Sequence, residues 1–368
     1  MNLGDPFETP VVLILFNRPH RVRELIQTLS IVRPKRILAI ADGPRAAHPT
    51  DVVACRLARS VLDEVDWPCS IEREFSATNL GCDHRIVSGL DWVFSQVDRA
   101  IVLEDDILPH PSFLPWAAAM LNRFGRDPTV GFISGRNPLG YWGKSDQDHI
   151  RANTGSILGW AATAQAWQRI QRYDLTGDPL QAVTEVGRLI QEPLLAAHRA
   201  IALRMFRRGE LAAWDTIFDL RAGMAGLHAI CSPVNLTRHT GIGSDATHTH
   251  TMLADDLGAL IQAHESRPIQ PSPIHQSPDS GFDRATMMVQ LLTRCRNPTM
   301  AVRLARLVRH GTQLPLDGAA RHHLAPFIHA TESLRLLDHL AAQGLSSPLF
   351  AQLLDAIRRQ ATEYVPVL

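Results

Sequence analysis

The first hundred residues alternate continuous apolar runs with amphipathic stretches. Positions 11–16 are all apolar, which is typical of a strand buried on both faces of a parallel sheet. The next segment spaces apolar residues three and four apart, as an amphipathic helix does. The same alternation predicts further strands at 36–40, 71–75 and 100–103 and helices at 52–65 and 85–96.

Strands separated by helices at this spacing predict a doubly wound α/β sheet. Such sheets bind ligands at the carboxyl ends of their strands, so the residues after each strand are the first place to look for chemistry. Beyond the first hundred residues, the pattern predicts a helix at 113–124, a strand at 130–134 and a mostly helical region at 181–208 that is interrupted near Pro193.

The last third of the chain has a different character. Residues 266–280 hold four prolines and predict a linker or a strap across the surface. Residues 282–368 show helical spacing almost throughout, which predicts a small all-helical unit. We therefore expect three parts: a catalytic or binding domain at 1–262, a Pro-rich linker at 263–281 and a helical domain at 282–368. This last unit offers a surface for forming a homo-oligomer.

Charge argues against nucleic acid as a partner. The 368 residues contain 37 Lys plus Arg and 37 Asp plus Glu, so the formal net charge is zero. Proteins that bind phosphate backbones or anionic lipid usually carry a basic excess.

The cysteines and the N-terminus predict a cytoplasmic protein. The five cysteines are scattered and form no CxxC pair, which argues against a disulfide framework and a structural zinc site. Asp5 and Glu8 stand where a signal peptide would carry basic residues. The longest apolar runs are about six residues, far below the ~20 that span a bilayer, so we expect no transmembrane segment.

The sharpest chemical feature is an acidic triplet, Glu104-Asp105-Asp106, directly after a predicted strand. Alternation along a strand places Glu104 and Asp106 on one face and Asp105 on the other. Adjacent carboxylates at the end of an apolar strand are costly unless a cation or a donor offsets their charge. A Mg²⁺ or Mn²⁺ ion shared with a diphosphate fits this set of ligands. The alternative is a group of acids that interacts with the N-terminus of the following helix.

Other strand ends add candidates. Asn17 and Arg18 follow the first strand, where the guanidinium can pair with a phosphate. Asp42 follows the second strand, where a carboxylate can accept from a nucleobase N–H. Taken singly, each is more often a surface turn residue.

The motifs together resemble a known family. FNRP, ADGPR, NLGC…GLDWVF, VLEDDILPHPSF, GWA…W and AAWD occur in this order. The order resembles GT-A-fold glycosyltransferases, most closely the inverting N-acetylglucosaminyltransferases that begin branching of N-glycans and their bacterial relatives. The likeness covers about residues 10–250. It implies a GT-A-like doubly wound mixed sheet flanked by helices, here followed by the C-terminal all-helical unit.

The resemblance also implies roles for individual residues. Asp106 resembles the ligand of a Mn²⁺ ion (or Mg²⁺) that bridges the donor diphosphate, and Glu104 resembles an acid near the ribose or sugar. Asp42 resembles the partner of a uracil N–H. One position departs from the family, because Gly89 stands where the family has a histidine in the helix before the triplet. The candidate donor-binding residues are Asn17, Arg18, Asp42, Arg85, Glu104, Asp105, Gly159, Trp160, Trp214 and Ser244.

Asp215 resembles the catalytic base of the family. A general base needs to be within hydrogen-bonding reach of the attacking hydroxyl. By the spacing rules alone, Asp215 could instead cap the apolar helix that follows it. The segment 239–250 contains two glycines and small polar residues, which is typical of a lid over substrate. By resemblance, Ser244 there contacts the donor phosphate and His248 completes the metal shell.

These residues predict a metal-dependent glycosyltransferase. It would move a hexosyl or N-acetylhexosaminyl group from a nucleotide-diphosphate donor, with UDP as the expected nucleotide, to a saccharide or other hydroxyl acceptor, with inversion. Two alternatives remain open: a sugar nucleotidyltransferase, and a nucleotide- or glycan-binding module that has lost catalysis. Gly89 keeps the second alternative open and leaves the identity of the base undecided.

Overall fold

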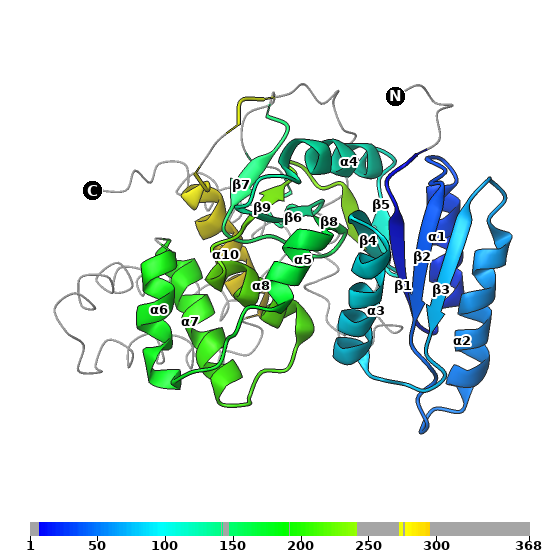
Figure 1. Ribbon diagram of the computed structural model, residues 1–368, viewed down its shortest axis with the longest axis horizontal. Helices are drawn as coiled ribbons and strands as arrows, with labels where there is room; N and C mark the ends of the chain where they lie inside the picture. The colour runs from blue at the N-terminus through cyan, green and yellow to red at the C-terminus, as the bar shows by residue number, and fades with distance from the viewer. Residues whose placement is uncertain are drawn as a thin grey trace, which may run out of the picture.

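A large mixed sheet forms the centre of the protein in the computed structural model, which describes residues 7–140, 142, 147–190, 192–240, 272–274 and 277–294 (Figure 1). The sheet has eight strands. In chain order they are β1 (Val11–Leu15), β2 (Arg36–Ala41), β3 (Ser70–Phe75), β4 (Arg99–Glu104), β6 (Val130–Ser134), β7 (Ile150–Ala152), β8 (Trp160–Thr163) and β9 (His228–Cys231).

The strand order is β3-β2-β1-β4-β8-β6-β9-β7. β3, β2, β1 and β4 run parallel to one another, and β6 runs parallel to β9. β8 is antiparallel to both β4 and β6, so β6 has the same direction as β4. The carboxyl ends of β1, β2, β4 and β6 therefore lie at one edge of the sheet. This confirms the predicted doubly wound, mixed α/β architecture.

Helices cover both faces of the sheet (Figure 1). Two 3₁₀ turns, η1 (Val61–Glu64) and η2 (Pro179–Gln181), adjoin them. The described helices are α1 (Pro19–Leu29), α2 (Thr50–Ser60), α3 (Cys82–Gln96), α4 (Phe113–Phe124), α5 (Ala164–Gln171), α6 (Ala182–Leu189), α7 (Pro193–Arg207), α8 (Trp214–Met224) and α10 (Ser280–Arg294).

The apolar run of β1 serves two cores at once. Val11 and Leu13 belong to the core that α1 and α4 cover, whereas Val12 and Ile14 belong to the core that α3, α5 and α8 cover. Every residue of β1 is buried, as expected for a strand between two helical layers. Because side chains alternate along a strand, the residue just past the end of each strand continues one of these two faces.

A short antiparallel pair lies outside the main sheet. β5 (Ile107–Pro109) follows the acidic triplet and pairs with β10 (Thr237–His239), which comes 130 positions later in the chain. The hydrophobic pattern did not predict this pair or the short strands β7, β8 and β9, because three- and four-residue strands give too few positions for an alternation to be recognised.

Helix boundaries agree closely with the pattern. The helix at 113–124 and the strand at 130–134 are found as predicted, and the break near Pro193 is real. Pro193 is the first residue of α7, and the Glu192 side chain accepts a 2.7 Å hydrogen bond from the Leu195 N–H at that helix start. The predicted helix at 85–96 begins earlier, at Cys82, directly after Gly81 with its positive φ of 82°.

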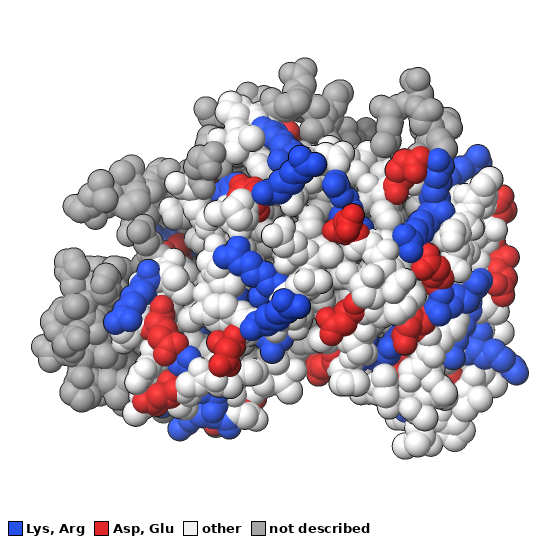
Figure 2. Space-filling model, in the orientation of Figure 1, with Lys and Arg blue, Asp and Glu red and all other residues white. Residues whose placement is uncertain are grey.

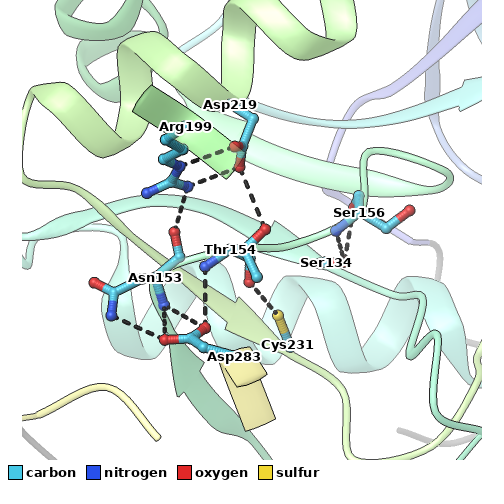
Figure 3. Close-up of polar contacts among 8 residues, drawn as sticks. All are labelled: Ser134, Asn153, Thr154, Ser156, Arg199, Asp219, Cys231 and Asp283. Atoms are coloured by element: carbon cyan, nitrogen blue, oxygen red, sulfur yellow. Dashed lines mark hydrogen bonds and ion pairs between the residues drawn. The ribbon is translucent and has the colours of Figure 1, made fainter. Parts of the chain in front are cut away.

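α10 is joined to the rest of the protein by a buried polar network (Figure 3). Asp283 of α10 accepts hydrogen bonds from the backbone and side-chain amides of Asn153 at 2.9 and 2.8 Å, respectively, and from the Thr154 N–H at 3.3 Å. Arg199 of α7 pairs with Asp219 of α8 and donates to the Asn153 carbonyl. The network fixes α10 against α7 and the end of β7.

The Pro-rich segment is described in part. Ser272 hydrogen-bonds to Asp148, and its carbonyl accepts from Arg123 of α4, so this part of the segment crosses the surface beside α4. The start of the predicted helical domain falls within α10, and Phe282 packs in the same core as α8. Residues 295–368 lie outside the described part of the chain, so the all-helical domain, its boundaries and its role in an oligomer stay predictions.

Candidate active site

The predicted strand ends meet at one edge of the sheet. Ile14 of β1 lies opposite both Ile40 of β2 and Glu104 of β4. Two residues beyond Ile14 and Ile40 are Phe16 and Asp42, so the loops after β1 and β2 flank the acidic triplet. The parallel register thus brings together candidates that are up to ninety positions apart in sequence.

Arg18 binds two of the three acids. Its Nη1 donates to Asp106 Oδ2 at 2.9 Å, and its Nη2 pairs with Asp105 Oδ1. Asp105 Oδ2 also accepts from the Phe16 N–H at 3.3 Å. Asp105 is buried and Arg18 is largely buried. The contact is therefore an internal ion pair at the carboxyl edge of the sheet and not a surface ion pair.

The predicted alternation of the triplet is therefore wrong past its first residue. β4 ends at Glu104, and Asp105 and Asp106 form a turn before β5. The strand rule stops where the strand stops, so Asp105 and Asp106 meet the same guanidinium instead of pointing to opposite faces. The helix-cap alternative also fails, because the first turn of α4 contains no acidic residue and β5 intervenes.

The three carboxyl groups have different proton affinities. Burial, together with the charges of Asp106 and Asp105, raises the pKa of Glu104 to about 8. Burial also raises the pKa of Asp105 to about 6, against the opposing effect of Arg18. Although burial acts on Asp106 too, contacts with His239 and Arg18 hold its pKa below the usual value. At neutral pH, Asp106 and most of Asp105 are thus ionised, whereas Glu104 retains a proton.

The β5–β10 pair closes one side of the triplet. His239 opposes Ile107 in this pair, and its Nε2 lies 3.6 Å from Asp106 Oδ2. The next residue, Thr240, donates from its N–H and from Oγ1 to the Asp106 carbonyl at 2.8 and 3.0 Å. The predicted Ser244 and His248 lie a few residues further on, outside the described residues, and stay predictions.

Within the described ranges, no three His, Cys, Asp or Glu side chains are already arranged around a common metal position. The chemistry of the triplet nonetheless suits a hard divalent cation, since its ligands are carboxylate oxygens. Arg18 binds only Asp105 and Asp106, and burial together with the charges of these two acids raises the pKa of the neighbouring Glu104. Asp106, with Glu104 beside it, is the site that fits such an ion.

Asp42 is fully hydrogen-bonded within the protein. Its Oδ1 accepts from the N–H groups of Gly43 and Leu80 at 2.8 and 2.9 Å. Its Oδ2 accepts from Asn79 Nδ2 at 2.9 Å and from the Gly81 N–H at 3.1 Å. A carboxylate offers about four acceptor positions, and all are used here. In the structure Asp42 holds the loop that starts α3, and its predicted contact with uracil is untested.

Asn17 and Arg85 are also engaged by protein groups. Asn17 Nδ2 donates to Asp51 Oδ1 at 2.8 Å, and Arg45 binds the same carboxylate through two nitrogens, which lowers the pKa of Asp51 to about 2. Arg85, buried on α3, donates to the Glu74 carbonyl and pairs with the Glu74 carboxylate at the end of β3. Both residues shape the edge near β1–β3, where the sequence predicted donor binding.

Asp215 is the second residue of α8 and is exposed. Its Oδ1 accepts from the N–H of Thr216 at 2.7 Å, within the same helix turn. At the start of α8, the Trp214 N–H donates a 2.8 Å hydrogen bond to the side chain of Asp83, which belongs to α3. Gly81, two residues before Asp83, donates to Asp42 at the carboxyl end of β2, and the charge of Asp215 contributes to the raised pKa of Glu104. α8 thus brings its N-terminus to the triplet edge.

Trp214 and Trp160 are core residues. Both are buried, and each packs against Phe218 of α8, with ring centroids 6.2 and 5.2 Å apart. Gly159, just before Trp160, has a φ of 82°, and a Cβ there would lie 2.4 Å from Thr237 Cγ2. This close approach lets β10 pass beside the end of β8. Gly159 therefore lies at the carboxyl edge of the sheet, whereas the side chain of Trp160 is part of the core next to that edge.

The packing of α3 against the sheet explains why position 89 is a glycine. A Cβ at this position would lie 2.5 Å from Cγ2 of Ile40 on β2. α3 lies so close to the sheet here that a larger residue does not fit without movement. A histidine at this position would therefore require α3 or the Ile40 side chain to move.

Asp51, Asp83 and Arg136 were not predicted as site residues, and His239 was predicted only as part of the lid segment 239–250. Asp83 had a signal, because it lies two residues before the helix predicted at 85–96, which follows the carboxyl end of a predicted strand. Arg136 had one as well, because it follows the predicted strand at 130–134 as Arg18 follows the first strand. The contact of His239 with Asp106 had none, because the pairing of β10 with β5 is a long-range contact.

No protein-family model matches the chain, and no curated protein matches it. Among solved structures, the chain is similar to one described as a putative glucose-1-phosphate thymidylyltransferase from Bacillus anthracis in complex with a sucrose. That match has a TM-score of 0.25 and 12% identity, and it covers 45% of this chain and 76% of that chain. A likeness at this level assigns neither fold nor function.

In the part of the chain that the structure describes, no helix has both the length and the apolar character needed to cross a membrane. Figure 2 shows basic and acidic side chains interspersed over the described surface of one face, without a broad patch of either sign.

Proposed function

We propose that the protein is a metal-dependent glycosyltransferase. It would transfer a hexosyl or N-acetylhexosaminyl group from a nucleotide-diphosphate donor, with UDP expected, to a hydroxyl acceptor with inversion. The observation that supports this most is the meeting of Arg18, the acidic triplet and the N-terminus of α8 at the carboxyl edge of the sheet. Ligands of doubly wound sheets bind at this edge.

In this proposal the donor lies along the edge, with its nucleoside over the loops after β1 and β2. Its diphosphate lies at Asp106. A divalent cation held by Asp106, with Glu104 beside it and His248 as a further predicted ligand, would supply positive charge for the departing diphosphate. Arg18 keeps Asp105 and Asp106 in place, so that Asp106 stays ionised.

Asp215 acts as the base in this scheme. Its carboxylate is exposed, and its bond to Thr216 leaves acceptor positions free. It takes the proton of the acceptor hydroxyl as the oxygen attacks the anomeric carbon. The bond from that carbon to the diphosphate oxygen breaks on the opposite face, and its electron pair stays with the diphosphate. Attack and departure on opposite faces invert the centre.

The test is release of free nucleoside diphosphate from a panel of nucleotide sugars with Mn²⁺, with Mg²⁺ and with a chelator. We expect Mn²⁺-dependent release with at least one donor, accelerated by a saccharide acceptor. Pyrophosphate formed from a nucleoside triphosphate and a sugar 1-phosphate would instead identify a nucleotidyltransferase. Metal-dependent binding of nucleotide sugars without release would identify a binding module.

A further inference from the structure

Arg136 lies at the same edge as the acidic triplet, on the other side of β8. Trp160 of β8 is the register partner both of Val102 on β4 and of Ser134 on β6. β4 and β6 run in the same direction, so the chain leaves both at the same edge of the sheet, with β8 between them. Glu104 is the last residue of β4, and Arg136 is two residues past the end of β6.

The chain continues past β6 in a fixed course. The N–H of Gly135 donates to the Gly159 carbonyl at 2.9 Å, and the Gly135 carbonyl accepts from the N–H of Leu236 at 2.9 Å. Asn137, on the other side of Arg136, is fully buried and donates to the loop after β9, from its N–H to Asn235 Oδ1 at 2.8 Å and from Nδ2 to the Pro233 carbonyl at 2.9 Å. Arg136 is therefore anchored on both sides by buried backbone.

Arg136 has no partner for its charge among the described residues. Its carbonyl accepts from Ser134 Oγ at 3.3 Å, but its guanidinium makes no hydrogen bond or ion pair with the described residues. Burial lowers the pKa of Arg136 to about 10. The neighbouring arginines differ. Arg18 binds Asp105 and Asp106, Arg45 binds Asp51, and Arg85 binds Glu74. A partly buried guanidinium without a counter-charge is costly, and an anionic ligand removes that cost.

We propose that Arg136 binds an anionic group, a carboxylate or a phosphate, of the ligand held at this edge. The order of strands assigns the group to a part of the ligand. The loops after β1 and β2 flank one side of the triplet and Arg136 flanks the other. If the proposed function holds, the nucleoside lies on the first side, and Arg136 faces the transferred sugar or the acceptor. The substrate class is then a negatively charged sugar or acceptor.

The test is the rate at which phenylglyoxal modifies Arg136 in the full-length protein, followed by peptide mass spectrometry. The probes are D-glucuronate and inorganic phosphate, with neutral D-glucose as the reference. We expect at least one anion at millimolar concentration to slow modification of Arg136 several-fold, and glucose to leave it unchanged. Protection by glucuronate identifies a sugar carboxylate, and protection by phosphate alone identifies a phosphate group. Equal rates with all three probes would overturn the proposal.

Two variants separate binding from general effects on the protein. Arg136→Gln removes the charge, and Arg56→Gln removes the charge of an exposed arginine on α2. We expect the protecting anion to raise the Tm of the wild type and of Arg56→Gln but not of Arg136→Gln. An undiminished Tm shift in folded Arg136→Gln would refute the contact.

The outcome of this test can be told apart from the outcome of the test of the proposed function. Loss of anion protection with intact Mn²⁺-dependent binding of nucleotide sugars would refute only the role of Arg136. Intact protection in a protein that binds no nucleotide with Mn²⁺ would refute the glycosyltransferase and leave the anion contact standing.

Discussion

Arg18 Nη1 donates to Asp106 Oδ2 at 2.9 Å across 88 positions of sequence. The contact exists because β1 and β4 are neighbours in the sheet, so the loop after β1 lies beside the acidic turn after β4. With its second nitrogen on Asp105, Arg18 offsets part of the charge that would otherwise drive the acidic turn apart.

Replacing Arg18 by Gln should therefore destabilise the protein. Loss of one partner leaves buried carboxylates without their counter-charge, which typically costs about 3 kcal/mol. The measurement is the free energy of unfolding in urea at neutral pH. Arg23→Gln is the control, because Arg23 pairs with Glu64 in an exposed ion pair and should have little effect. Equal small losses in both variants would show that Arg18 is not needed to hold the turn.

Asp106→Asn should abolish Mn²⁺-dependent binding of the nucleotide donor. The substitution keeps the size of the side chain but removes the charge that a cation requires. Calorimetric titration with a nucleotide sugar, with and without Mn²⁺, measures the effect. Asp98→Asn, an exposed position just before β4, is the matched control and should bind as the wild type does. Unchanged Mn²⁺-dependent affinity in Asp106→Asn would rule out Asp106 as the ligand.

Asp215→Asn should keep donor binding and lose turnover. Removal of a general base typically lowers the rate by about 10²- to 10⁴-fold. Glu210→Gln, a nearby exposed carboxylate before α8, should retain the wild-type rate. The measurement is kcat for release of the nucleoside diphosphate, together with donor affinity. A normal kcat in Asp215→Asn would move the role of base to another residue.

Gly89→Ala should destabilise the fold. The new Cβ would lie 2.5 Å from Ile40 Cγ2, and overpacking of this kind costs about 1–3 kcal/mol, against a helix-propensity gain of about 1 kcal/mol. Gly187→Ala on α6 is the matched control, since a Cβ there meets nothing within 4 Å. It should gain stability by the propensity term. Thermal unfolding of both variants measures the difference, and a gain in both would show that α3 can move away from β2.

The stability of the protein should fall as pH rises through the weakly acidic range, because of Asp283. Burial raises its pKa to about 7 in the folded protein, whereas an unfolded aspartate titrates near pH 4. Between these values the folded state holds a proton that the unfolded state has lost. This one group therefore contributes a loss of at most about 1.4 kcal/mol per pH unit, which ends above pH 7.

Asp283→Asn should remove the contribution of this group and so reduce the slope, while Glu104 and Asp105, whose pKa values are also raised, continue to contribute. Urea unfolding at several pH values between 4 and 8 measures the slope, and Asp66→Asn, an exposed position, should leave it unchanged. If Asp283→Asn showed the wild-type slope, the pH dependence would come from another group.

The sequence alone determined the layered α/β fold and the edge at which to look. Apolar runs bounded by amphipathic helices are local signals, so β1, β2, α4 and β6 were predicted nearly to the residue. The acidic triplet is also a local signal. Three acids directly after an apolar strand are unusual whatever the position of that strand in the sheet. Which side chains meet is not a local property, and the sequence did not predict that Asp105 turns to the same guanidinium as Asp106.

Only the tertiary structure decided the partners. Strand order placed Arg18 on the triplet, the β5–β10 pair brought His239 to Asp106, and the pairing of β8 with both β4 and β6 placed Arg136 at the same edge as Glu104. Each of these depends on pairing between segments far apart in the chain. The hydrophobic period of a segment says that it is a strand and which residues are buried, but carries no information about which other strand will lie beside it.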